Sequence, residues 1–186
     1  MILTPDNEYA AVLDACVLAP MPLADTLLRC AEEPALFRVL WSKETLVEVH
    51  RTLIKFGYTI DQADRRLKQM AIAFPEAEID FPANLLKSLD DLPDQKDRHV
   101  VAAAIHARAH VIVTSNVKHF PSILLEGHDL LVQSPDEFLV HQFHLNSARM
   151  LDVLDTQAGA IGQTRSEIME RLSVVLPKFS RVASSE

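Results

Sequence analysis

Short apolar runs alternate with longer segments of helical period along the first 140 residues of the chain. Runs rich in β-branched residues predict buried strands, whereas apolar residues three or four positions apart predict helices that bury one face. Val111-Ile112-Val113-Thr114 is the clearest strand of this kind. The predicted strands are residues 9–14, 78–80, 111–114 and 129–132.

The helices expected between these strands are marked by capping residues, proline and glycine. Expected starts are Pro20 with Pro22, Ser42, Thr59 or Asp61, Pro121 and Ser134, and expected stops are Gly57 and Pro75. Two further helices are expected near residues 84–89 and 100–109. The buried stripes of the first three helices are expected to include Leu23, Leu27 and Leu28, then Leu46, Val49, Leu53 and Ile54, then Leu67, Met70 and Ile72.

This alternation of strands and helices predicts an α/β fold with a central, mostly parallel sheet covered by helices on both faces. Residues 146–180 differ, because they read as two amphipathic helices, 147–158 and 166–176, without a cluster of ligand-type side chains. We therefore expect a domain over residues 1–140 and a C-terminal helical extension over residues 141–186, which packs on the body or on a partner.

Composition restricts the class of protein. The chain has 186 residues, of which 48% are hydrophobic and 24% charged, so wholesale disorder and a coiled-coil rod are excluded. No apolar run approaches the roughly 18 residues of a membrane-spanning helix. The first residues lack the basic and apolar regions of a secretory signal. Cys16 and Cys30 lie in segments that read as buried, so we expect no disulfide framework and a cytoplasmic protein.

The net charge of −8 belongs to residues 1–140, because residues 141–186 hold five basic and five acidic side chains. The chain therefore lacks the overall basic charge of a module that binds duplex nucleic acid. An acidic body serves solubility, or it places several carboxylates around a metal ion. The sequence alone leaves both explanations open.

The inventory of residues excludes several kinds of site. Four glycines cannot form a Walker loop or a Gly-x-Gly-x-x-Gly turn, and neither Cys-x-x-Cys nor His-Glu-x-x-His occurs. A nucleophilic Cys16 close to His99 stays open as an alternative. A thiol after an apolar strand is more often buried and unreactive.

Polar residues follow two of the predicted strands, where ligands of open α/β sheets usually bind. Asp14 ends the first strand, and Ser115-Asn116 follow residues 111–114. Asp94 and Asp97 stand at the start of the preceding helix, and Glu48 lies inside the Ser42 helix. Each acid alone has an ordinary explanation as a helix cap or a solvated side chain. Their convergence at one site is the hypothesis.

Four segments in this order and spacing resemble a PIN domain, and more narrowly the VapC-type toxins of bacterial toxin–antitoxin pairs. They are VLDACVL (12–18), WS (41–42) with Glu48, DQKDRHV (94–100) and VTSNVKHFP (113–121). The resemblance covers roughly residues 8–140, and the last helices resemble the C-terminal extension of one VapC subgroup. It implies a PIN-like three-layer α/β/α fold.

The resemblance also implies a hydrolase, an endoribonuclease that depends on Mg²⁺ and accepts Mn²⁺. Carried over by position, Asp14, Glu48 and Asp97 are catalytic acids and metal ligands, and Asn116 holds the fourth catalytic position. The implied supporting residues are Ser42, Asp94, Thr114 and Ser115. Two departures from the family pattern are Cys16, where Asn or Ser is more usual, and Asn116 itself, which leaves a second metal in doubt.

Hydrolysis of a phosphodiester explains why such groups are needed. Mg²⁺ prefers oxygen ligands, and a divalent cation activates water and neutralises phosphate oxygens. Three carboxylates in one cleft would repel each other and the RNA without that cation. Arg98, Lys118 and Lys96 flank the acids and are the expected contacts to RNA phosphate.

The expected partners are RNA, a cognate antitoxin and a second copy of the chain in a homodimer, with no membrane. The alternative function is a catalytically degenerate PIN-like module that binds protein, which Cys16 and Asn116 favour. The only tryptophan, Trp41, is expected in the core rather than as a platform for stacking bases.

Overall fold

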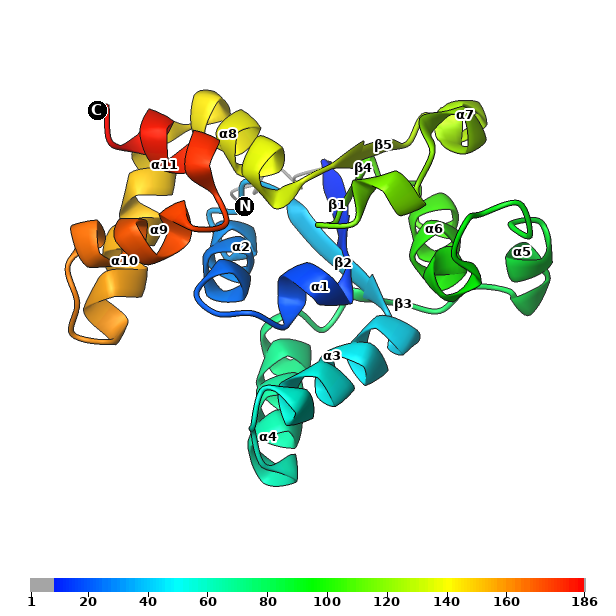
Figure 1. The fold of residues 1–186 in the computed structure, drawn as a ribbon, viewed down its shortest axis with the longest axis horizontal. Coiled ribbons are helices and arrows are strands. Elements are labelled where there is room, and N and C mark those ends of the chain that lie inside the picture. The colour runs from blue at the N-terminus through cyan, green and yellow to red at the C-terminus, as the bar shows by residue number, and fades with distance from the viewer. Residues whose placement is uncertain (1–8, 186) are drawn as a thin grey trace, which may run out of the picture.

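The computed structural model describes residues 9–185 and contains a five-stranded, all-parallel sheet in the order β3-β2-β1-β4-β5 (Figure 1). Residues 1–8, on which the expectation about a secretory signal rests, lie outside this range. Val12 of the central strand pairs with Leu40 on one side and with Ile112 on the other. The strands are β1 (Ala10–Leu13), β2 (Arg38–Ser42), β3 (Glu78–Ile79), β4 (Val111–Val113) and β5 (Leu131–Gln133). The α/β prediction is confirmed.

Helices cover both faces of the sheet, and each face has its own apolar cluster. Successive side chains of a strand point to opposite faces, so Ala11 and Leu13 of β1 join one cluster while Ala10 and Val12 join the other. The first cluster packs against α1 (Ala15–Leu18), α2 (Leu23–Ala31), α3 (Lys43–Lys55), α4 (Ile60–Ala73) and α8 (Pro135–Leu145). The second packs against α5 (Ala83–Lys87), α6 (Arg98–His106) and α7 (Ser122–Leu125). Three short 3-10 turns complete this part, η1 (Gln95–Asp97), η2 (Val117–His119) and η3 (Glu126–His128).

Most helices begin at the residues that the sequence marks. Ser42 caps α3 by accepting the Thr45 N–H, and Thr59 and Ser134 each form a capping box. Gly57 follows α3 with φ of 91°, a conformation that favours glycine. These caps fix where α3 leaves β2 and therefore where Glu48 lies.

The C-terminal segment is helical, as predicted, and consists of α9 (Ser147–Ala160), α10 (Arg165–Ser173) and α11 (Pro177–Ala183). These helices lie together at one side of the molecule, beside α2 and α8 (Figure 1). Their apolar residues share the first cluster with the sheet, including Met150, Leu172 and Phe179. Helix α8 itself runs through the expected boundary at residue 140, and the division into two parts stays a prediction.

Buried polar contacts also attach these helices to the body. Gln157 of α9 accepts the Thr26 hydroxyl at 2.8 Å and donates to the Pro22 carbonyl at 3.1 Å. The buried Asp136 carboxylate of α8 accepts the backbone N–H groups of Lys178 at 3.1 Å and Phe179 at 2.8 Å. The start of α11 is therefore held by a carboxylate, which interacts favourably with a helix N-terminus.

The structure corrects the sequence-based elements in three places. Strand β2 was not predicted, although it pairs directly with the central strand. Helices α1 and α11 were not predicted as separate helices. Ile54 and Ile72, expected in buried stripes, are 38% and 62% exposed, because they follow the buried Leu53 and Met70 by one and two positions and so face away from the core. The α3–α4 pair itself projects from the sheet (Figure 1).

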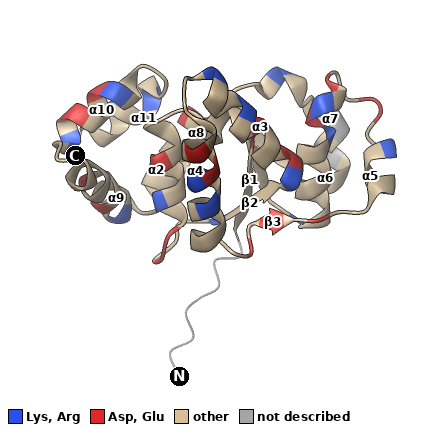
Figure 2. Cartoon of the chain, turned by 90° about the horizontal axis from the view of Figure 1, so that it is seen from below, with Lys and Arg blue, Asp and Glu red and all other residues tan. Residues whose placement is uncertain are grey.

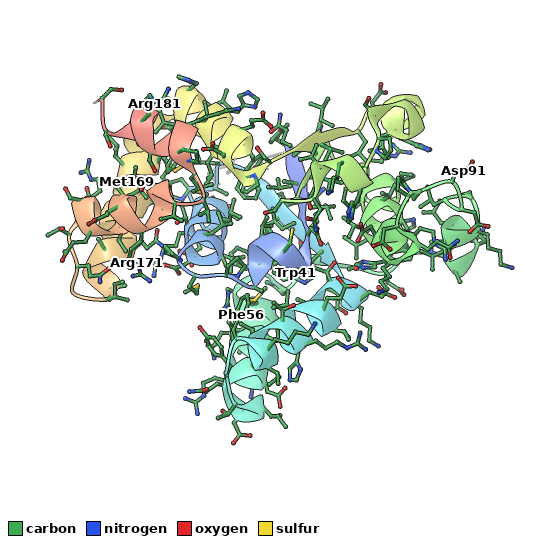
Figure 3. The ribbon with its side chains drawn as sticks, in the orientation of Figure 1. Trp41, Phe56, Asp91, Met169, Arg171 and Arg181 are labelled. Atoms are coloured by element: carbon green, nitrogen blue, oxygen red, sulfur yellow. The ribbon has the colours of Figure 1, made fainter. Side chains whose placement is uncertain are left out.

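Two other expectations are confirmed. Trp41 is buried in the core, and its ring meets the Phe74 ring edge-on with centroids 6.0 Å apart (Figure 3). Cys16 and Cys30 are free thiols.

Over residues 9–185, no helix has the length and apolar character needed to cross a membrane. Basic and acidic segments are interspersed over the helices instead of gathering on one element (Figure 2).

Candidate active site

Asp14 lies directly after β1, at the carboxyl edge of the sheet, with its side chain 5% exposed. The Thr114 hydroxyl donates to Asp14 Oδ2 at 2.6 Å, and the Cys16 thiol donates to the same oxygen at 3.1 Å. Thr114 reaches Asp14 because β4, which it follows, pairs in parallel with β1. Asp14 makes no side-chain capping bond to α1, so a role as helix cap does not explain this acid.

The loop after β4 is built around the same two side chains. The Ser115 N–H donates to Cys16 Sγ at 3.2 Å, and the Asn116 N–H donates to Thr114 Oγ1 at 3.0 Å. Asn116 therefore joins the site through its backbone, while its side chain is exposed. Cys16 stands where the family pattern of the sequence analysis has Asn or Ser, and its thiol also donates a hydrogen bond to Asp14.

The Cys16 thiol is poorly suited to nucleophilic chemistry. Burial, and then the negative charge of Asp14, raise the pKa of Cys16 to about 11. Because the thiolate is the reactive form, very little nucleophile is present at neutral pH. The alternative of a Cys16 nucleophile activated by His99 is also not supported by contacts, since His99 bonds to other residues among those described.

Asp97 lies at the end of η1 and forms a compact group with Asp94 and His119. Asp97 Oδ2 lies 2.9 Å from His119 Nδ1, and one ligand atom from each of the three residues falls within 4.8 Å of the others. Burial raises the pKa of Asp97, and the nearby Asp14 and Asp94 carboxylates add to that rise while the His119 hydrogen bond opposes it. Asp94 also caps η1 by accepting the Lys96 N–H at 2.9 Å.

Glu48 lies on α3 with its carboxylate half-buried, and His99 connects it to the rest of the site. His99 is 6% exposed; its Nε2 lies 3.3 Å from Glu48 Oε1, and its Nδ1 lies 2.8 Å from Ser42 Oγ. His99 is only two residues after Asp97 in the chain, so the residue that contacts Glu48 lies in the first turn of the helix that follows Asp97.

The structure thus brings Asp97 together with Asp94 and His119, with Asp14 close enough for its charge to act on Asp97, whereas the printed side-chain contact of Glu48 is to His99. Two contributors, His119 and His99, were missed as site residues, although both lie inside the quoted segments. The signal for His119 was its place three residues after Asn116, in a turn that brings it back to Asp97.

The basic residues expected to contact RNA differ in their surroundings. Lys96 and Lys118 are exposed. The Arg98 guanidinium is paired with the Asp90 carboxylate and donates to the backbone carbonyls of Gln95 at 3.1 Å and Leu86 at 3.4 Å. Arg98 thus stabilises the segment before α6 by hydrogen bonds, and its contact with RNA phosphate stays a prediction.

Comparison with known proteins identifies relatives of the chain and its family. The chain is 37% identical over 92 residues to a Mycobacterium tuberculosis protein named "Putative ribonuclease VapC50", a stretch that covers 47% of this chain and 54% of that protein. The chain thus matches about half the length of this curated relative. A solved structure of VapBC-1 from nontypeable Haemophilus influenzae aligns with a TM-score of 0.47 and 20% identity, over 68% of this chain and 98% of that one. Residues 10–118 match the PIN domain family, and the chain is a PIN domain protein related to the VapC toxins.

Proposed function

We propose that this protein is a metal-dependent endoribonuclease that hydrolyses RNA phosphodiester bonds and acts as a VapC-like toxin. The observation that carries the proposal is the compact group of Asp94, Asp97 and His119, with Asp14 close enough for its charge to act on Asp97. The name of the related M. tuberculosis protein, a ribonuclease, supports the same reaction.

The donor set fits a divalent cation. Carboxylate oxygens suit Mg²⁺ and Mn²⁺, and an imidazole nitrogen suits Mn²⁺. Burial, and in smaller part the carboxylates of Asp14 and Asp94, raise the pKa of Asp97, and a cation would relieve the repulsion between these carboxylates. Asp14, Asp97 and Glu48 would hold the ion, with Asp94 and His119 beside them and Asn116 as a neutral contributor. When bound, the ion would activate water and neutralise charge on the phosphate.

Hydrogen bonds hold the Asp14 carboxylate in one orientation, which would favour metal binding. Thr114 and Cys16 both bond to Oδ2, so among the described residues no hydrogen bond occupies Oδ1. Oδ2 of Asp14 is therefore fixed by hydrogen bonds, and Oδ1 is available to bind a metal ion. Ligand carboxylates that are hydrogen-bonded in this way bind metal in a fixed geometry.

The substrate and partners are also part of the proposal. Exposed Lys96 and Lys118 beside the acids would contact RNA phosphates, and Arg98 would do so after release from Asp90. We further propose a homodimer and a cognate antitoxin, whose cationic side chain would pair with the site carboxylates when no metal is bound.

Binding of Mn²⁺ to the purified protein tests whether the proposed site exists. At a free concentration ten times the dissociation constant, binding stabilises the folded state by about 1.4 kcal/mol, which is seen as a rise in the melting temperature. Samples without Mn²⁺ and samples treated with EDTA serve as controls. No rise with Mn²⁺ would favour the alternative, a PIN-like module that binds protein without catalysis.

Removal of the His119 imidazole tests its place among the metal-holding residues. His119→Ala is expected to lower Mn²⁺ affinity by about tenfold or more, the usual effect of losing a group that holds or binds a metal ligand. The loss for Mg²⁺ should be smaller, because Mg²⁺ prefers oxygen. Calorimetric titration of both ions measures the difference, and equal losses would mean that His119 only holds Asp97.

Cys16→Ser tests whether the Cys16 thiol acts only as a hydrogen-bond donor to Asp14. A serine hydroxyl can donate to Asp14 as the thiol does, so RNA cleavage should fall by less than about tenfold, the equivalent of one ordinary hydrogen bond. Initial rates of cleavage at saturating Mn²⁺ measure this. A loss as complete as that from removing a site carboxylate would restore the Cys16 nucleophile as a candidate.

A further inference from the structure

We propose that His99 is a positioning residue, which orients the Glu48 carboxylate and thereby sets the affinity of the site for its cation. The inference rests on the proposed function, in which Glu48 is one of the metal-holding acids. It adds a role for a buried side chain that does not itself belong to that set of acids.

The imidazole of His99 lies between two groups of α3. Its Nδ1 is 2.8 Å from Ser42 Oγ at the helix cap, and its Nε2 is 3.3 Å from Glu48 Oε1. Thr45 Oγ1, at 3.5 Å from Nδ1, is the other polar contact of the ring among the described residues. Since the residue is only 6% exposed, protein groups and not bulk water determine how the ring bonds.

The Glu48 carboxylate decides which nitrogen of a neutral His99 ring carries the proton, because an ionised carboxylate can only accept a hydrogen bond. Ser42 Oγ accepts the Thr45 N–H at 3.0 Å, and its own proton can then be donated to the nearby Nδ1 of His99. A neutral ring that accepts at Nδ1 carries its proton on Nε2, because the bond made by one nitrogen fixes the state of the other. Nε2 then donates to Glu48, and the Ser42 hydroxyl at the cap of α3 can complete the arrangement by donating to Nδ1.

This contact restricts a side chain that would otherwise be mobile. The Glu48 side chain is 34% exposed, and a glutamate loses considerable rotamer freedom when it is held in one orientation. His99 also lies in the first turn of α6, directly after Asp97. It therefore ties Glu48, which its ring contacts, to the start of the helix that Asp97 precedes.

Two substitutions separate positioning from a merely structural role. The side-chain amide of glutamine reaches about as far as His99 Nε2 and can donate to Glu48, whereas that of asparagine reaches only as far as Nδ1 and can bond to Ser42. If His99 serves stability alone, His99→Asn should be the better tolerated variant, because it keeps the partner of the helix cap. If His99 positions Glu48, His99→Gln should be the better tolerated variant in metal binding.

The experiment is a calorimetric titration of the full-length protein with Mn²⁺ in the absence of RNA, together with thermal unfolding of each metal-free variant. We expect His99→Gln to bind Mn²⁺ nearly as wild type does, and His99→Asn to bind about 10-fold to 100-fold more weakly, as for other residues that orient ligands. Cleavage by His99→Asn should recover at saturating Mn²⁺. His106→Asn, at an exposed histidine of the same helix, should match wild type.

The outcomes distinguish this inference from the proposed function. Equal Mn²⁺ affinity in His99→Asn and His99→Gln, or a better result for His99→Asn, would overturn the positioning role while the metal site stands. Wild-type protein that binds Mn²⁺ yet leaves RNA intact would overturn the nuclease proposal alone. Wild-type protein that does not bind Mn²⁺ would overturn both.

Discussion

Asp14→Asn is expected to cleave RNA about 1,000-fold more slowly than wild type, the equivalent in rate of the several kcal/mol that a catalytic cation contributes. The variant loses a charged ligand at the most buried of the three acids. Initial rates on a single RNA substrate at saturating Mn²⁺ measure the effect, and a Mn²⁺ titration shows how much of it comes from weaker binding.

The same variant should keep its fold. The amide oxygen of asparagine can still accept from Thr114 and Cys16, and the repulsion between residue 14 and Asp97 is removed. Asp91→Asn is a matched control, since Asp91 is exposed in the loop between α5 and α6 (Figure 3) and is not one of the proposed site residues. Unchanged cleavage by folded Asp14→Asn protein would exclude Asp14 from the chemistry.

Phe179→Ala is the substitution with the largest expected effect on stability, a loss of about 3–5 kcal/mol. Phe179 of α11 is fully buried in the cluster that the C-terminal helices share with the sheet, and its ring meets the Phe143 ring edge-on at 6.3 Å. Such a loss is a large part of the roughly 5–15 kcal/mol that stabilises an ordinary domain.

The readout shows whether the helical extension and the body unfold together. Fluorescence of Trp41, the only tryptophan, reports on the body, whereas circular dichroism reports on all helices. Both midpoints in urea should shift together in Phe179→Ala. The control is Val174→Ala, at a side chain that is 83% exposed, where a change within about 0.5 kcal/mol is expected. A shift seen by circular dichroism alone would mean that the extension folds separately.

The positions of the acids could be predicted because their signals are local. A short apolar strand places Asp14 at its end, and the caps at Ser42 and Asp94 fix the helix and turn that carry the other acids. The fold class followed from the alternation of these elements. Strand β2 escaped prediction because its three central apolar residues run directly into the cap of α3, without a turn to mark a strand.

The histidines could not be predicted because their roles depend on contacts far apart in sequence. His99 meets Glu48 across 51 positions, and His119 meets Asp97 across 22. Periodicity likewise gave the inward faces of α3 and α4 but not how far the core extends around them. Ile54 and Ile72 follow the buried Leu53 and Met70 by one and two positions, and a rotation of about 100° or 200° turns their side chains away from the core.

Cleavage of total RNA tests the central claim most directly. Wild-type protein, purified beside Asp14→Asn from the same host, is incubated with RNA and Mn²⁺, with EDTA, and with EDTA followed by excess Mn²⁺. The account predicts discrete fragments with Mn²⁺, none with EDTA, and their return when Mn²⁺ is restored, with Asp14→Asn inactive throughout. Intact RNA in every wild-type sample, or the same fragments from Asp14→Asn, would contradict it.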